Sequence, residues 1–386
     1  MLTRTPSETR APENSGKPAK RLRDPRLDVF RGIGMLIILI AHIPGNHWTL
    51  WIPARFGFSD ATEMFVFLSG MASAIAFGRL FDREGLFMLT GRAAQRVWQI
   101  YWAHVCVFII IATLMAAAGN KPDGTSYIQS LNLVRFFSDP ASLLPGLLAL
   151  TYVPNYFDIL PMYMVILVLM PLMLLAERVH KGLPFVLMAV LWLSAQVPLA
   201  HFPAEPWSER RWFFDPFGWQ LLFFLGFFLM RGTLKAPGYD RRLMILAIAI
   251  AVLTVPFAWH VIRNAVPVFA EIAASLRPLT DKTAFGVLRL VHFLALAYIA
   301  VHAVGEGGNR LHHPAIRPVV RVLMKVGQQS LAVFVTGMVL AQMIGIALDH
   351  TGRTALPVAA ANLSGFAVLI VTAYLVGRFK AAPWKA

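Results

Sequence analysis

Charged side chains are scarce in this chain of 386 residues, since Asp, Glu, Lys and Arg together make up only 14% of it. A soluble globular protein carries about 25% charged residues, so this chain has too few of them to cover a surface that faces water. It also has a single cysteine, Cys106, which excludes an internal disulfide and a thiolate cluster for a metal. No long polar stretch separates the apolar segments, so the composition favours one helical bundle in a membrane.

Long apolar runs follow one another along the chain, and hydrophobic residues make up 57% of it. A bilayer core of about 30 Å needs roughly 20 apolar residues per helix. The runs therefore predict an all-α, polytopic membrane helical bundle of about ten transmembrane helices. The expected spans are residues 29–45, 57–78, 94–117, 157–176, 183–200, 216–232, 242–260, 284–303, 326–348 and 358–378.

Three further segments lie outside these spans. Residues 1–26 are rich in Pro, Thr, Lys and Arg and have almost no large apolar side chains, which predicts a disordered basic cytoplasmic arm. We expect a single transmembrane domain over 27–380 and a short cytoplasmic tail over 381–386. The short apolar stretch 141–153 contains Pro145 and Gly146, so it predicts a re-entrant or interfacial turn.

The first apolar segment lacks the small-residue cleavage site of a signal peptide and leads into a second helix, so we expect it to be retained. If the N-terminus is cytoplasmic, the segments on that side hold 25 of the 35 Lys and Arg residues. This bias follows the positive-inside rule and predicts that both termini are cytoplasmic. The formal net charge of +15 is spread over many loops rather than gathered on one face, which argues against nucleic acid as a partner.

Ionisable residues at membrane depth are costly and usually mark a functional site. The first helix carries Asp28 and Arg31 near its cytoplasmic end and His42 near its outer end. His42 is eleven positions after Arg31, so both point to one face and lie about 16 Å apart along the axis.

The second helix begins with two carboxylates, Asp60 and Glu63, which lie one turn apart. Glu63 is expected at the same depth as His42, and a carboxylate that pairs with an imidazole raises its basicity and fixes its tautomer. We therefore expect His42 to be a general base that Glu63 or Asp60 orients. A plain role for Asp60 at the beginning of the helix is an equally good interpretation.

Further polar side chains gather at the same outer level, near the beginnings of three later helices. They predict an outward-facing polar pocket, although each also fits a helix cap or an interfacial anchor. No metal and no bound cofactor are expected in it. The candidates are Asp158, Tyr163, Arg211, Asp215, Trp219, Gln220, Arg289, His292 and Tyr298.

Several of these stretches resemble the OpgC family, and the resemblance extends over nearly all of residues 21–345. It implies a multi-pass protein of the bacterial inner membrane that transfers succinyl groups to osmoregulated periplasmic glucans. The family is related to the acyltransferase-3 superfamily, whose first helix carries Arg, ten residues and then His, the spacing of Arg31 and His42. The stretches that carry the resemblance are Arg21–Gly32, His42–Asn46, Phe56–Gly70, Asp158–Pro161, Asp215–Phe223 and Arg289–Tyr298.

The resemblance also implies substrates and roles. Acyl-CoA, with succinyl-CoA as the first candidate, would arrive from the cytoplasm, and a glucan hydroxyl would arrive from the periplasm. His42 would act as the base, while Arg31 and Asp28 would hold the donor. Arg289 and Arg211 are candidates for binding the acyl carboxylate, because guanidinium binds carboxylate bidentately.

Two departures from the family pattern limit this transfer of roles. Ala41 stands where many relatives have Asp before the histidine. The partner of His42 must therefore come from elsewhere, and Glu63 becomes the stronger candidate for it. Gln329 stands where the family has a second histidine, so no proton relay is expected there.

Two other classes fit the same residues. A proton-coupled transporter or exporter of an anionic glycan or organic acid would use the His and carboxylates as a relay. Transporters commonly contain inverted repeats, and the two halves of this chain show no internal similarity. A scaffold held together by buried polar pairs is the third interpretation. The sequence leaves open the acyl group, the acceptor glycan, a covalent acyl-His intermediate and the oligomeric state.

Overall fold

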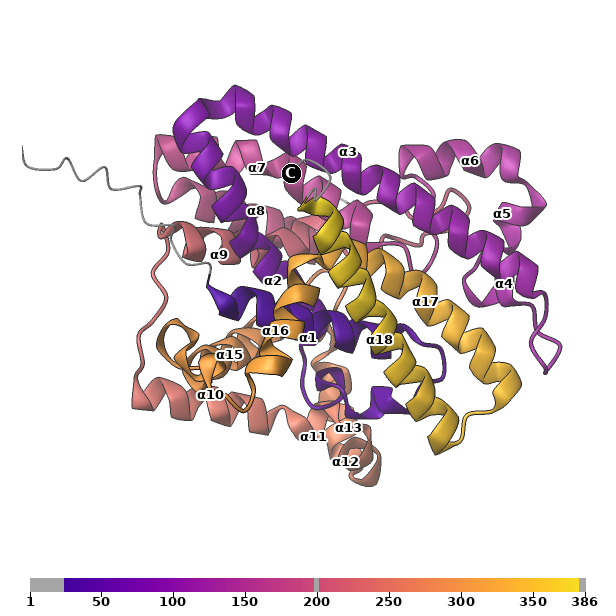
Figure 1. Ribbon diagram of the computed structural model, residues 1–386. Coiled ribbons are helices and arrows are strands. Elements are labelled where there is room, and N and C mark those ends of the chain that lie inside the picture. The colour runs from indigo at the N-terminus through magenta and orange to yellow at the C-terminus, as the bar shows by residue number, and fades with distance from the viewer. Residues whose placement is uncertain (1–23, 198–200, 382–386) are drawn as a thin grey trace, which may run out of the picture.

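The computed structural model describes residues 24–197 and 201–381, and its regular elements in these ranges are all helical (Figure 1). The predicted all-α class is thus confirmed. The predicted arm 1–26 and tail 381–386 lie mostly outside the described residues. Helix α1 nevertheless begins inside the predicted arm, at Pro25, because the Asp24 carboxylate caps it by accepting the Arg26 amide at 3.0 Å.

The helices differ widely in length. The longer ones are α1 (Pro25–His42), α2 (Ala61–Ser73), α3 (Arg79–Ala118), α7 (Ile159–Val179), α8 (Leu183–Gln196), α9 (Pro216–Arg231), α10 (Arg241–Leu253), α15 (Val287–Ala303), α16 (Arg317–Gln328), α17 (Ser330–Thr351) and α18 (Ala355–Lys380). The shorter ones are η1 (His47–Trp51), η2 (Pro53–Arg55), α4 (Tyr127–Ser130), α5 (Val134–Ser138), α6 (Pro140–Ala149), α11 (Val255–Ala258), α12 (His260–Ala265), α13 (Pro267–Ser275), α14 (Arg277–Thr280) and η4 (Glu306–His312).

Five helical segments of the described chain are long and apolar enough to cross a membrane. A sixth is possible if α15 and η4, which are bent by 64° relative to each other, form one broken span. Helices α6, α8 and α9 are apolar but have only 10 to 16 residues, which is short for a bilayer core. These helices are consistent with a membrane helical protein, while the ten spans and the cytoplasmic termini stay predictions.

The structure corrects the predicted end of the second span at residue 78. Helix α2 continues through a π-helical turn, η3 (Ala74–Gly78), into α3, so the helix runs past residue 78, and residues 61–118 are helical on both sides of a kink at Gly85. The polar residues after 78 favour helix as strongly as the apolar ones before them. The stretch bends at Gly85, whose φ of 78° is non-helical and suits glycine.

Helix α1 lies at the centre of the bundle, in contact with α2, α16, α17 and α18 (Figure 1). Glycines bring α1 and α16 together closely, since a Cβ on Gly32 would lie 2.1 Å from the Leu323 carbonyl oxygen. Helices α2 and α9 approach in the same way, with the Cβ position of Gly70 1.9 Å from the Phe223 carbonyl oxygen. Such close backbone contacts fix helix positions in a membrane protein, where the hydrophobic effect between helices is weak.

Candidate active site

A cavity of about 460 Å³ lies between the C-terminal end of α1 and the N-terminal ends of α2 and α7. Apolar residues form much of its wall, as is usual for a small-molecule site. Its polar members come from four separate parts of the chain: His42, Asp60, Thr62, Asn155, Tyr156, Asp158 and Lys282.

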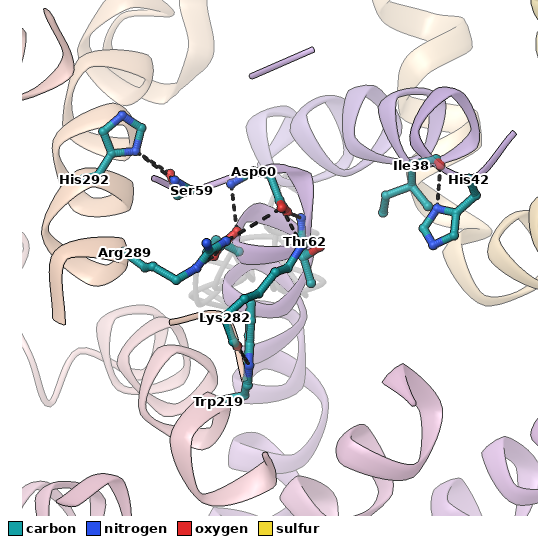
Figure 2. Close-up of polar contacts among 10 residues, drawn as sticks. Ile38, His42, Ser59, Asp60, Thr62, Trp219, Lys282, Arg289 and His292 are labelled. Carbon is teal, nitrogen blue, oxygen red and sulfur yellow. Dashed lines mark hydrogen bonds and ion pairs between the residues drawn. The ribbon is translucent and has the colours of Figure 1, made fainter. Parts of the chain in front are cut away.

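His42 is the last residue of α1, and its side chain lines this cavity. Its Nδ1 lies 2.7 Å from the Ile38 carbonyl oxygen, one turn earlier (Figure 2). A carbonyl oxygen only accepts, so Nδ1 carries the proton and the lone pair of the neutral ring is on Nε2. The Tyr156 ring packs edge-on against the imidazole at 5.2 Å, and the Tyr156 hydroxyl donates to the Met338 carbonyl at 2.8 Å.

Asp60 and Glu63 form a capping box at the beginning of α2. The Asp60 carboxylate accepts the Thr62 amide at 2.7 Å, and the Glu63 carboxylate accepts the Asp60 amide at 2.8 Å. Two cations neutralise the pair: Lys282 Nζ lies 2.5 Å from Asp60 Oδ2, and Arg289 Nη2 lies 2.5 Å from Glu63 Oε1. Figure 2 shows Asp60, Lys282 and Arg289 converging, with His42 set apart at the end of α1.

The expected pairing of Glu63 with His42 is therefore wrong. The capping box turns the Glu63 side chain back toward the Asp60 amide, and Arg289 holds its other oxygen. The imidazole is oriented by the Ile38 carbonyl instead. Asp60 shares the cavity with His42, whereas Glu63 is fully buried behind it.

Arg31 and Asp28 lie on the other half of α1 and do not line the cavity. The Arg31 guanidinium is buried and donates to the Leu68 carbonyl at 2.8 Å, which ties α1 to α2. The Asp28 carboxylate is fully buried and accepts from the Gln328 amide at 3.2 Å, which ties α1 to α16. Both contacts connect helices, and the donor-binding role of the two residues stays a prediction.

Three predicted residues at the beginning of α9 lie outside the cavity wall. Asp215 caps the helix by accepting the Phe217 amide at 2.8 Å, and Gln220 donates to the Met188 carbonyl at 2.8 Å. The Trp219 indole donates to the Lys282 carbonyl at 2.9 Å and so holds the backbone of a cavity residue. Arg211 is exposed and lies in an isolated β-bridge with Pro203, away from the cavity wall.

His292 positions the loop that leads to Asp60. Its Nδ1 accepts the Ser59 amide at 3.2 Å and lies 2.7 Å from the Ser59 hydroxyl (Figure 2). The imidazole also requires a glycine at position 57, because a Cβ there would lie 2.1 Å from Nε2. Tyr163 packs against Phe223 with ring centroids 5.8 Å apart, in the helix interface below the cavity wall.

The expected place of Tyr298 in the pocket is wrong. Its hydroxyl accepts the Asp240 amide at 2.8 Å and donates to the Gly238 carbonyl at 2.9 Å, just before α10. Tyr298 is nine positions after Arg289, which corresponds to about 13 Å along α15. Tyr298 therefore holds α10 against α15 at the end remote from the cavity.

The family model described as OpgC protein matches residues 23–381, nearly the whole chain. The chain belongs to the OpgC family. This membership confirms the resemblance seen in the sequence and associates the chain with glucan modification, while the relation to acyltransferase-3 stays a prediction. No curated protein and no solved structure matches the chain.

Several cavity residues of this OpgC-family protein were missed by the sequence analysis. Asn155, Tyr156, Phe213 and Phe214 lie in loops that carry no periodic signal. The two phenylalanine rings flank the ammonium of Lys282 at 6.0 and 5.7 Å, an arrangement that favours a cation. The one feature of the sequence that could have indicated these loop residues is the aromatic, Pro-rich composition of the outer loops.

Asp158 precedes α7 and joins two of these loops, since its carboxylate accepts the Phe213 amide at 2.8 Å. Burial raises the pKa of Asp158 and the hydrogen bond from Phe213 lowers it. Burial has the larger effect, so the pKa is raised to about 6. Among residues 24–197 and 201–381, no three His, Cys, Asp or Glu side chains are placed to hold a metal ion. The cavity thus offers an imidazole nitrogen, a cation and carboxylates, which is chemistry for proton transfer and anion binding.

Proposed function

We propose that this protein is a membrane-bound acyltransferase of the bacterial inner membrane. It would move an acyl group, with succinyl as the first candidate, from cytoplasmic acyl-CoA to hydroxyl groups of a periplasmic glucan. The observation that carries this proposal is the tautomer of His42: with Nδ1 bonded to Ile38, the basic Nε2 is available in the wall of the cavity. Family membership supports the same class of reaction.

The reaction needs a base because a sugar hydroxyl is a poor nucleophile at neutral pH. His42 Nε2 takes the hydroxyl proton while the oxygen attacks the thioester carbonyl. A C–O bond forms, the C–S bond breaks, and the imidazolium returns its proton to the departing CoA thiolate. The Ile38 carbonyl stabilises the imidazolium through the Nδ1 proton, the role that a carboxylate has in many other His sites.

Lys282 takes the place that we expected for Arg289 and Arg211 as the group that binds the acyl carboxylate. Of the described residues that line the cavity, it is the one Lys or Arg. Arg289 is held behind Asp60 and Glu63, and Arg211 lies outside the wall. The Lys282 ammonium would share its charge between Asp60 and the free carboxylate of a dicarboxylic acyl group.

The test uses the full chain in proteoliposomes with radiolabelled succinyl-CoA outside and a β-glucan on either side of the membrane. Covalent label on the glucan is the expected result. Absence of labelled glucan under all orientations would contradict the acyltransferase proposal. If free glucan or organic acid crosses the membrane instead, the protein is a transporter.

A further inference from the structure

Three cations from three different helices converge at the end of the bundle opposite the cavity. They are Arg96 of α3, Lys325 of α16 and Lys380 at the end of α18. Lys380 Nζ donates to the Gln329 side chain at 2.8 Å, and the charges of Arg96 and Lys380 are close enough to repel each other. Lys325 Nζ lies against Gly377, where a Cβ would come within 2.5 Å of it.

The partners of these cations are neutral groups. Arg96 donates to Gln99 at 3.0 Å, Lys325 lies over the Tyr374 ring at 5.8 Å, and Lys380 bonds to Gln329. None of the three takes part in a salt bridge with a carboxylate of residues 24–197 or 201–381. Like charges brought together without counter-charges repel one another, and a bound anion would remove that repulsion. The positive-inside rule accounts for basic residues on this side, but it does not require three helices to bring them together.

The cluster lies at a suitable distance from the cavity for one ligand to reach both. Helix α16 packs on the first turns of α1, where a Cβ on Gly327 would lie 2.0 Å from the Asp28 carbonyl oxygen. Lys325 and Gln329 flank Gly327 in sequence. His42 is fourteen residues beyond Asp28 on α1, which corresponds to about 21 Å along the helix axis. A donor with anionic groups at one end and a thioester at the end of an extended arm matches this separation.

We propose that Arg96, Lys325 and Lys380 bind the phosphate groups of the CoA donor at the cytoplasmic face, with Gln329 holding Lys380 in place. This inference rests on the proposed acyl-CoA chemistry. Guanidinium and ammonium groups are the usual phosphate ligands in proteins. The headgroup phosphate of an anionic lipid has the same chemistry, so the test must separate the two sources.

The test measures binding of CoA itself to the purified full chain in nanodiscs of neutral lipid, by isothermal titration calorimetry at two salt concentrations. The variant is Lys325→Gln/Lys380→Gln, and the matched control is Lys181→Gln, an exposed lysine of the loop between α7 and α8. The double variant removes two charge-assisted hydrogen bonds to the donor, so we expect it to bind CoA at least about tenfold more weakly. Gly377→Ala, whose Cβ displaces the Lys325 amine, is expected to weaken binding without removing a charge.

Dephospho-CoA, which lacks the 3′-phosphate, should bind more weakly than CoA to the wild type and lose less in the double variant. Equal CoA affinity in wild type and double variant, with equal thermal unfolding midpoints, would overturn the proposal. An effect of the variant only in nanodiscs that contain phosphatidylglycerol would assign the cluster to lipid and overturn it too. The binding experiment contains no glucan, so it tests the cluster independently of acyl transfer. If the cluster binds CoA but a separate transfer assay labels no glucan, only the proposed function is refuted. If acyl transfer occurs and the KM for succinyl-CoA is unchanged in the double variant, only this inference is refuted.

Discussion

Arg289 of α15 and Glu63 of α2 form an ion pair of 2.5 Å, in which the side chains are only 10% and 0% exposed. Lys282 and Asp60 form a second pair of 2.5 Å beside it. The first pair is buried, and the second faces the cavity. The buried pair therefore fixes the end of α2 that presents Asp60 to the cavity.

Removing one partner of the buried pair is expected to destabilise the fold. Glu63→Gln or Arg289→Met leaves an uncompensated group in the interior, which typically costs about 3–5 kcal/mol. The double variant removes both charges, so it should lose clearly less than the sum of the single losses. Thermal unfolding in one detergent measures this double-mutant cycle, and additive losses would show that the pair is not energetically coupled.

The glycine contact between α2 and α9 gives a second prediction. Gly70→Ala places a methyl group 1.9 Å from the Phe223 carbonyl oxygen, so the helices must separate and the yield of folded protein should fall sharply. Gly91→Ala in α3 is the matched control, since no atom lies within 4 Å of its Cβ position. Size-exclusion profiles and unfolding midpoints of the two variants should differ clearly. Similar behaviour of both variants would argue against close α2–α9 packing.

Asp158 should make the stability of the protein depend on pH. Its pKa is raised from 3.8 to about 6 by burial, so the folded state favours the neutral carboxyl. The stability that the neutral Asp158 carboxyl contributes is fully present below the unfolded-state pKa of 3.8, and it is lost as the pH rises through about 6. Asp158→Asn keeps a neutral acceptor for the Phe213 amide. Relative to wild type, this variant should gain stability between pH 4 and pH 7.5, by roughly 3 kcal/mol at most.

Unfolding midpoints of wild type and Asp158→Asn across this pH range provide the measurement. A constant difference between the two proteins would show that Asp158 has an ordinary pKa in the folded state. Asp139→Asn is a suitable control, because this carboxylate is exposed and hydrogen bonds from Ser142 lower its pKa instead of raising it.

Lys282 should set the preference for a dicarboxylic acyl group. Lys282→Met removes the ammonium that lies 2.5 Å from Asp60 and leaves that carboxylate facing the cavity. We expect kcat/KM for succinyl-CoA to fall at least about tenfold relative to that for acetyl-CoA. Lys282→Arg, which keeps the charge, should retain the preference for succinyl. An unchanged ratio of the two donors in Lys282→Met would refute the role of this lysine in binding the acyl group.

The helices could largely be predicted from the sequence, because apolar runs of sufficient length have few other structures open to them. The span predicted at 358–378 is found as α18, Ala355–Lys380. Errors arose where polar residues continue a helix, as between Arg79 and Arg96. The break between α16 and α17 at Gln329 is another difference from the predicted span 326–348, because hydropathy alone does not report a change of helix direction.

The site was predictable in part. His42 and Asp60 were identified as ionisable groups at helix ends, and the cavity brings them together. The partner of Glu63 was not predictable, since Arg289 is 226 residues away and several basic residues had the same expected depth. Tyr156 was missed because it lies in a loop with a φ of 88°, a backbone conformation that sequence does not indicate for tyrosine.

The most direct test of the account compares acyl transfer by wild type and His42→Ala in nanodiscs, with labelled succinyl-CoA and a β-glucan. General base catalysis typically contributes about 10²–10⁴-fold, so the rate of glucan labelling should fall by at least about 10²-fold in the variant. The unfolding midpoint should change little, because the His42 side chain makes its described hydrogen bond within its own helix and its ring contact with the edge of a single ring, that of Tyr156. A folded His42→Ala protein that labels glucan at the wild-type rate would contradict the central claim.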